Sequence, residues 1–182
     1  MNTFSPQTNR GFTLVETLVA IAILLVAIVG PFYAVSKSIT AAYVARDQLT
    51  ASSLAQEGAE YLYTLRDSNY LAGYTWLAGV DGSSDAVGHS ANCFSPNKCV
   101  IDVSRDTIQI CPGGGCPAIG IDTGGLYTQD TSNWPSTRFT RSVQILPVLG
   151  APYEVQVVIT VTWKTLGRTY TAVVNDELYN WL

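Results

Sequence analysis

The feature that most constrains this chain is an apolar run near its N-terminus with a single carboxylate, Glu16, at its start. Residues 17–36 contain no charged side chain. About 20 residues of α-helix cover about 30 Å, which is the thickness of the hydrocarbon core of a bilayer. The run therefore predicts a membrane-spanning helix. Glu16 stands at its edge, where an unpaired carboxylate costs about 2.5 to 3.5 kcal/mol.

Three interpretations of this segment compete. A secretory signal peptide would be cut after the run, at residues 34–38, but the run exceeds the usual apolar length of about 7–15 residues and a helical pattern continues beyond it. An uncleaved single-span anchor leaves Glu16 with Arg10 as the nearest cation in the preceding sequence. A cut between Gly11 and Phe12 instead creates an α-amino group at helical spacing from Glu16, where the two charges neutralise each other.

The stretch "RGFTLVETLVAIAIL", which begins at Arg10, resembles the leader and first helix of type IV pilins and pseudopilins. The resemblance implies that a prepilin peptidase cuts after Gly11 on the cytoplasmic side and methylates the new amine of Phe12. It also implies that Glu16 pairs with this amine, in the same or a neighbouring subunit, and so directs assembly. The Lys and Arg residues on the two sides of the span are nearly balanced, so the orientation follows from the resemblance alone.

Apolar positions continue after the span at steps of three, four or seven, which predicts one helix of roughly 50 residues. Residues 12–36 form its membrane and assembly half, and residues 37–67 form an amphipathic half that packs on a folded domain. Pro31 predicts a kink or a local opening, because it removes a backbone donor and clashes with the preceding turn. The resemblance supports this role, whereas the alternative is a proline of the kind that membrane helices tolerate.

The rest of the chain predicts loops followed by an antiparallel sheet. Residues 67–125 are rich in turns, with one short hairpin expected in "CVIDVSRDTIQIC". In "YEVQVVITVTW", apolar residues including Trp163 alternate onto one face, and "RFTRSVQIL" and "RTYTAVV" supply neighbouring strands. This order resembles the pilin fold. The predicted class is α+β, a long N-terminal helix packed on a C-terminal antiparallel sheet, with residues 1–11 as leader and 68–182 as an extracytoplasmic globular domain.

Four cysteines lie in the loop-rich segment: Cys93, Cys99, Cys111 and Cys116. An even number on the predicted outer side favours two disulfides. Local pairing of Cys93 with Cys99 and of Cys111 with Cys116 ranks first, and a bond between Cys99 and Cys111 is the alternative.

A metal site and an enzyme active site are both disfavoured. His89 precedes Cys93, but the C-x5-C and C-x4-C spacings differ from the short hooks of zinc modules. Asp81 and Asp85 are candidates for calcium, although a solvated turn explains them better because the EF-hand pattern is absent. The single His lacks a G-x-S-x-G partner, and "PGGGCP" lacks the Lys of a phosphate loop. We predict neither cofactor nor catalysis.

The formal charge of -4, with Lys and Arg scattered singly, disfavours direct nucleic acid binding. The C-terminal pattern "VVITVTW", with the ending "DELYNWL", resembles minor pilins and minor pseudopilins of the PilV or GspI type. This resemblance implies a minor pilin of a type IV pilus, with a type II secretion pseudopilin as the alternative. A single-span adhesive or receptor domain that is never cleaved is the alternative from another class.

The resemblance also implies partners and a location. The partners are a prepilin peptidase, other pilins or pseudopilins, and the assembly platform protein with its ATPase. The subunit is expected in the cytoplasmic membrane, crossing it once with its C-terminal domain outside the cytoplasm, and afterwards in the pilus or pseudopilus.

Overall fold

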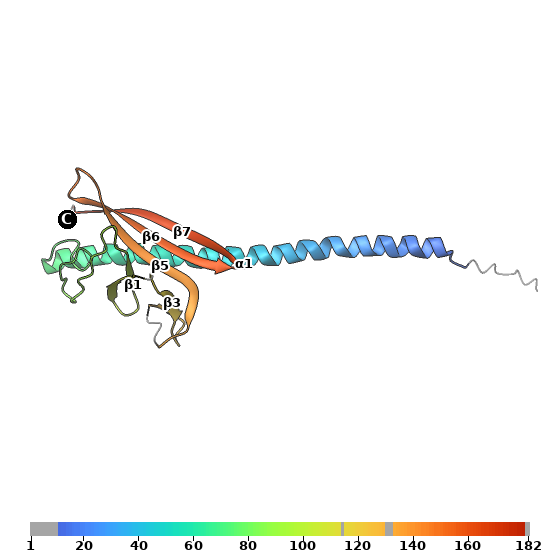
Figure 1. Cartoon of the computed structure of the whole chain (residues 1–182), viewed down its shortest axis with the longest axis horizontal. Helices are drawn as coiled ribbons and strands as arrows, with labels where there is room; N and C mark the ends of the chain where they lie inside the picture. The colour runs from blue at the N-terminus through green and yellow to red at the C-terminus, as the bar shows by residue number, and fades with distance from the viewer. Residues whose placement is uncertain (1–10, 114, 130–132, 181–182) are drawn as a thin grey trace, which may run out of the picture. The chain divides into compact units, whose positions relative to one another are not determined.

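The structure is a computed structural model that describes residues 11–113, 115–129 and 133–180. Most of the predicted leader therefore lies outside the described residues. The chain divides into two compact units, Met1–Val44 and Ala45–Leu182. Within the described ranges, one helix precedes seven strands (Figure 1). These elements are α1 (Leu14–Ala72), β1 (Cys99–Asp102), β2 (Thr107–Ile110), β3 (Ala118–Ile121), β4 (Tyr127–Thr128), β5 (Ser136–Pro147), β6 (Glu154–Thr165) and β7 (Arg168–Tyr179).

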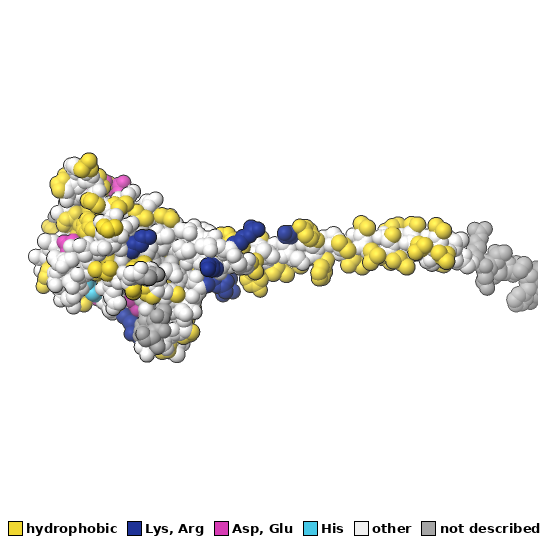
Figure 2. Space-filling model, in the orientation of Figure 1, with side chains coloured by type: hydrophobic (Ala, Val, Ile, Leu, Met, Phe, Trp, Pro, Cys, Tyr) yellow, Lys and Arg dark blue, Asp and Glu magenta, His cyan; other side chains and the backbone are white. Residues whose placement is uncertain are grey.

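The first unit contains the apolar part of α1. The helix is long and apolar enough to cross a membrane, with a mean hydropathy of 2.7 in its most apolar window, none of which is buried. Figure 2 shows hydrophobic side chains along the visible face of this part of the helix. The predicted long apolar helix is thereby confirmed. Pro31 lies inside α1, which is α-helical on both sides of it; its role as a kink stays a prediction.

The second unit begins with the amphipathic part of α1, which packs on an antiparallel sheet. Its buried apolar face recurs at steps of three and four and consists largely of small side chains. A Cβ added at Gly58 would lie 3.6 Å from Cγ2 of Ile159 on β6, so the helix backbone runs close to the sheet. The residues of this face are Ala51, Leu54, Ala55, Gly58, Ala59 and Leu62.

Helix α1 ends in a left-handed cap. Gly73 has φ +77, its N–H bonds to the carbonyl of Tyr70 at 3.2 Å, and the N–H of Tyr74 bonds to the carbonyl of Asn69 at 2.9 Å. This pair of bonds is the Schellman motif, which satisfies carbonyls that the last helical turn leaves open. Glycine is favoured at this position because it adopts a positive φ without strain.

Strands β5, β6 and β7 form the antiparallel meander that the sequence predicts. Ile159 of β6 lies opposite Val143 of β5 and Val174 of β7, and the odd-numbered residues of β6 from Val155 to Thr165 are buried. Trp163 is 1% exposed and stacks on Tyr170 at 5.7 Å between ring centroids. The predicted α+β pilin-like fold, and Trp163 as a core residue, are confirmed.

Strands β1 and β2 form the predicted hairpin, and β1 and β3 pair with β5 along the edge that β6 leaves free. Strands β3 and β4 are additional to the sequence prediction. "AIGI" is too short and too rich in small residues to give an alternating signal, and its pairing with β5 is a long-range contact.

Two disulfides fasten the loop region. Cys93 pairs with Cys99, and Cys111 pairs with Cys116, which is the local pairing ranked first above. The first bond is in the core, since both of its cysteines are 0% exposed. Cys111 and Cys116 are only partly buried.

Candidate functional site

The predicted cleavage site lies directly before α1. Gly11 and Phe12 precede the helix, and both are exposed. Thr13 Oγ1 accepts a hydrogen bond from the backbone N–H of Glu16 at 3.2 Å. Thr13 is therefore the N-cap residue, Leu14 is the first helical residue, and Glu16 occupies the third helical position. The sequence "TLVE" has the form of a capping box, which explains why the helix starts here.

The carboxylate of Glu16 has no ion-pair partner among the residues that the structure describes. It lies in the first turn, where the positive end of the helix macrodipole favours a negative charge. The predicted partner is the α-amino group of Phe12. In the chain described here, this nitrogen is part of the peptide bond to Gly11 and carries no charge. Glu16 therefore already has its helix position in the uncut chain, and the predicted cleavage would add the opposite charge.

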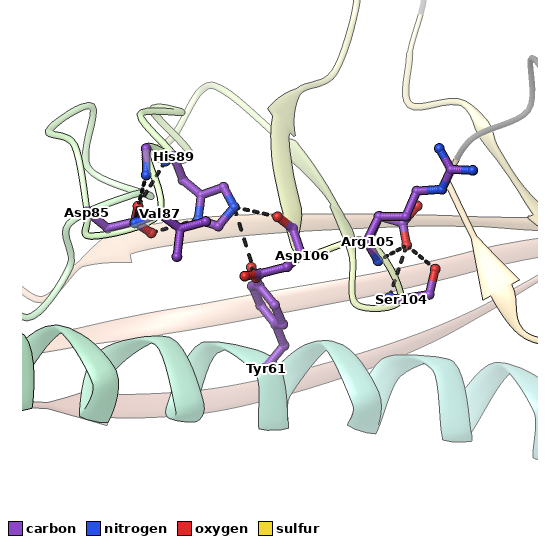
Figure 3. A network of polar contacts seen from close by, with 9 residues as sticks. Tyr61, Asp85, Val87, His89, Ser104, Arg105 and Asp106 are labelled. Carbon is purple, nitrogen blue, oxygen red and sulfur yellow. Dashed lines mark hydrogen bonds and ion pairs between the residues drawn. The ribbon is translucent and has the colours of Figure 1, made fainter.

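A second polar cluster, in the second unit, centres on His89. Its Nδ1 lies 2.6 Å from Oδ2 of Asp85, and its Nε2 lies 2.6 Å from the backbone oxygen of Asp106 (Figure 3). Tyr61 of α1 donates a hydrogen bond to Oδ1 of Asp106 at 2.6 Å. The cluster thus connects the loop after α1, the β1–β2 turn and the helix. Both ring nitrogens face oxygen acceptors, so this arrangement favours the doubly protonated imidazolium form of His89.

The surroundings of His89 and Asp85 favour the positive charge on the imidazole and the negative charge on the carboxylate. Burial by itself lowers the pKa of His89, but the Asp106 carbonyl and the Asp85 carboxylate raise this pKa above its ordinary value. Burial by itself raises the pKa of Asp85, but hydrogen bonds from His89 and from backbone N–H groups lower this pKa below its ordinary value. In the doubly protonated form, His89 has no free lone pair with which to act as a general base or as a metal ligand.

The calcium and zinc alternatives gain no support from these residues. Asp85 Oδ1 accepts hydrogen bonds from the backbone N–H groups of Val87, Gly88 and His89, at 2.8 to 3.0 Å. Asp81 Oδ1 accepts from the backbone N–H of Ser83 at 2.8 Å. Both carboxylates organise turns, and no group of three or more His, Cys, Asp or Glu residues suited to a metal ion exists within the described ranges.

Sequence reasoning missed a buried cation that joins the helix to the sheet. Arg141 of β5 is 3% exposed. It donates to the carbonyl of Leu54 at 2.9 Å, to Oε2 of Glu57 at 2.6 Å and to the carbonyl of Ile101 at 2.5 Å. Arg141 therefore connects α1, β1 and β5. One sequence signal could have revealed it: Arg141 stands in β5 at a position where the alternation places a buried, apolar residue.

Comparison with known proteins supports the N-terminal assignment. Residues 7–30 match the family model described as the prokaryotic N-terminal methylation motif. The matched segment includes Gly11, Phe12 and Glu16. No curated protein and no solved structure matches the chain. The motif, together with the α+β pilin-like fold, supports a type IV pilin-like family and a processed structural subunit that assembles with other pilins.

Proposed function

We propose that this protein is a minor pilin, a structural subunit of a type IV pilus. A prepilin peptidase cuts between Gly11 and Phe12 and methylates the amine of Phe12. The subunit then assembles through its N-terminal helix, with the help of the platform protein and its ATPase. The observation that carries the proposal is the frame of Gly11, Phe12 and Glu16 directly before an exposed apolar helix, within a matched methylation motif.

Each part of the chain has one task in this proposal. Residues 1–11 are the leader, and residues 12–36 cross the membrane and later pack in the filament core. Residues 37–67 carry the folded domain of residues 68–182 outside the cytoplasm. Charge neutralisation between the Phe12 amine and Glu16 fixes the axial register of neighbouring helices. Pro31 permits the helix to open locally during packing, because it lacks a backbone donor.

The minor-pilin subtype has its support in the C-terminal strand pattern, with β6 and β7 as its two strands. A minor pseudopilin of type II secretion is the second candidate, because the methylation motif supports pilins and pseudopilins alike. Deletion of the gene separates the two: loss of pili with normal protein secretion favours the pilin, and the reverse favours the pseudopilin.

The decisive experiment is the intact mass and N-terminal residue of the protein purified from its own membrane. The proposal requires a chain that starts at N-methylated Phe12. A chain that keeps Gly11 and the preceding residues, in cells with an active prepilin peptidase, would contradict it and favour an uncleaved single-span domain.

A further inference from the structure

Four exposed cations of the second unit lie at or next to residues that meet at one buried carboxylate. Asp47 of α1 is 8% exposed, and its Oδ2 lies 2.9 Å from a guanidinium nitrogen of Arg138. Thr165, at the end of β6, also donates a hydrogen bond to Asp47. The cations around this point are Arg46, Arg138, Lys164 and Arg168, which we call the cationic collar. Figure 2 shows dark blue side chains gathered in this part of the molecule.

The fold brings the collar together from separate segments. Arg46 precedes Asp47 on the helix, and Arg138 lies near the start of β5. Lys164 precedes Thr165, and Arg168 is the residue opposite Thr165 in the β6–β7 pairing. The turn between β6 and β7 therefore places two cations beside Thr165, the residue that bonds to Asp47.

The collar has an excess of positive charge in a chain whose net charge is negative. Asp47 is paired with Arg138, whereas Arg46, Lys164 and Arg168 make no ion pair with any residue in the described part of the chain. All three side chains are exposed. Such a group of unpaired, solvated cations attracts an anionic surface more strongly than a neutral one.

The position of the collar along the chain indicates that the anionic surface is that of the membrane. The charge-free run ends at residue 36, and Arg46 lies ten residues further along the chain (46 − 36). Ten residues of helix cover about 15 Å. Headgroups extend roughly 5 to 7 Å beyond the hydrocarbon core on each side of a bilayer. The remaining distance is about one Debye length at physiological ionic strength, and flexible Lys and Arg side chains shorten it.

We propose that the cationic collar binds the phosphate groups of anionic phospholipids and holds the second unit against the bilayer before the subunit enters a filament. This inference rests on the membrane anchoring that is part of the proposed function. Zwitterionic headgroups carry no net charge and do not replace the anionic ones. Each Lys or Arg near an anionic surface shifts the ratio of docked to undocked domains about fivefold, so removal of two lowers it roughly 30-fold.

The test uses the full chain in nanodiscs of phosphatidylcholine, with or without phosphatidylglycerol. A fluorescent amino acid replaces Thr169, beside the collar, and a headgroup-attached quencher reports its distance from the bilayer. A second reporter at Leu149, in the β5–β6 loop, is the positional control. We expect quenching at residue 169 only with phosphatidylglycerol, and its loss in Lys164→Gln/Arg168→Gln and at high salt. Lys98→Gln/Arg105→Gln removes the same charge elsewhere and should leave quenching unchanged.

Quenching that is independent of phosphatidylglycerol, or that survives the Lys164→Gln/Arg168→Gln change, overturns the inference. If the Lys164→Gln/Arg168→Gln change leaves quenching unchanged but impairs incorporation into filaments, the collar instead binds the acidic surface of a neighbouring subunit. Far-ultraviolet circular dichroism and the thermal midpoint of each variant check that the domain is folded. The N-terminal mass tests the proposed function separately, since an unprocessed chain with phosphatidylglycerol-dependent quenching would refute processing and leave the collar intact.

Discussion

Nδ1 of His89 lies 2.6 Å from Oδ2 of Asp85, and the other nitrogen of the same ring lies 2.6 Å from the backbone oxygen of Asp106. A neutral imidazole has one N–H and so satisfies only one of these acceptors. The folded domain therefore favours the doubly protonated ring, which links the loop after α1 to the β1–β2 turn. This link makes the stability of the domain depend on pH.

The first prediction concerns this dependence. The pKa of His89 is raised above its ordinary 6.5, so its contribution is complete below about pH 6.5 and is lost as the pH rises through the folded-state pKa. The pKa of Asp85 is lowered below 3.8, so its contribution is present above that pH and is lost as the pH falls through its folded-state pKa. We expect maximal stability of this link between about pH 4 and pH 6.5.

Urea unfolding of the wild type and His89→Gln in detergent, from pH 5 to pH 9, measures the effect. His89→Gln should lower the free energy of unfolding by about 1.5 to 3 kcal/mol at pH 5.5 and by less at pH 8, because a hydrogen bond to a charged group is lost. His89 is the only histidine of the chain, so its NMR titration is unambiguous. Equal losses at both pH values, or a titration below pH 6.5, would contradict the imidazolium assignment.

The second prediction concerns Arg141. Its replacement by Ala removes the hydrogen bonds that the guanidinium donates to the carbonyls of Leu54 and Ile101 and removes the partner of Glu57. Breaking a buried charged contact of this kind costs about 3 to 5 kcal/mol. Glu57→Gln should cost less, because the Glu57 side chain is 38% exposed and the guanidinium keeps two carbonyl acceptors. Chemical unfolding of each variant measures its free energy of unfolding, with Lys164→Ala as the surface control. Equal stability of Arg141→Ala and the control would refute the prediction.

The third prediction contrasts two glycines. A Cβ at Gly58 meets Arg141 Cδ at 3.5 Å and Ile159 Cγ2 at 3.6 Å, which is ordinary contact, and Ala is the better helix former. Gly58→Ala should raise the free energy of unfolding by about 0.5 to 1 kcal/mol. Gly73 has φ +77, so Gly73→Ala should lower this energy by about 1 kcal/mol. Thermal unfolding measures both, and a lower midpoint for Gly58→Ala would indicate that the helix cannot accept the methyl group.

The sequence predicted most elements because their signals are local. The charge-free run of residues 17–36 and the alternation around Trp163 each specify an element without reference to distant residues. The amphipathic part of α1 follows from apolar residues at steps of three, four or seven, which is also a local signal. The Thr13 cap was also readable, since "TLVE" has the form of a capping box.

The missed features depend on contacts between residues far apart in the chain. Arg141 contacts Leu54 across a sequence separation of 87 residues, and no local pattern reports that a helix carbonyl will lie above a strand arginine. His89 reaches Asp106 across a turn, although its spacing from Asp85 was visible. The short strand β3 forms only because β5 offers a free edge.

The fourth prediction ranks the two disulfides. Each closes a short loop, with sequence separations of 6 and 5, so the loop-closure contribution is similar, about 2 kcal/mol for each. Cys93 and Cys99 are also fully buried in the core. Cys93→Ala/Cys99→Ala should therefore cost more than Cys111→Ala/Cys116→Ala, by on the order of 1 to 2 kcal/mol from lost packing.

Graded reduction followed by alkylation and mass spectrometry tests the same ranking without mutation. Cys111 and Cys116 should be alkylated at lower reductant concentration, because they are partly exposed. Earlier reduction of Cys93 and Cys99 would show that their region opens more readily than the core burial implies.

The fifth prediction separates two roles of Glu16. Its backbone N–H bonds to Thr13 Oγ1, and its carboxylate is the predicted partner of the Phe12 amine. Gln also fits the third position of a capping box, so Glu16→Gln keeps a hydrogen-bonding side chain and removes the charge, whereas Glu16→Ala removes both of these side-chain properties. Both variants keep the backbone N–H that bonds to Thr13 Oγ1, so only Thr13→Ala removes this cap. An unpaired charge in an apolar helix bundle costs about 2.5 kcal/mol or more, so incorporation into filaments should fall well over tenfold in both variants.

Quantitative immunoblots of sheared filaments and membranes provide the measurement, with Glu60→Gln, an exposed carboxylate on the second half of α1, as the matched control. Membrane levels should stay normal in every variant, because the apolar run is unchanged. If both Glu16 variants assemble normally and Thr13→Ala does not, helix capping, worth about 1 kcal/mol, is the property that assembly requires. If only the two Glu16 variants fail, the side-chain charge is the property that assembly requires, as we expect for a carboxylate that pairs with the α-amino group of Phe12.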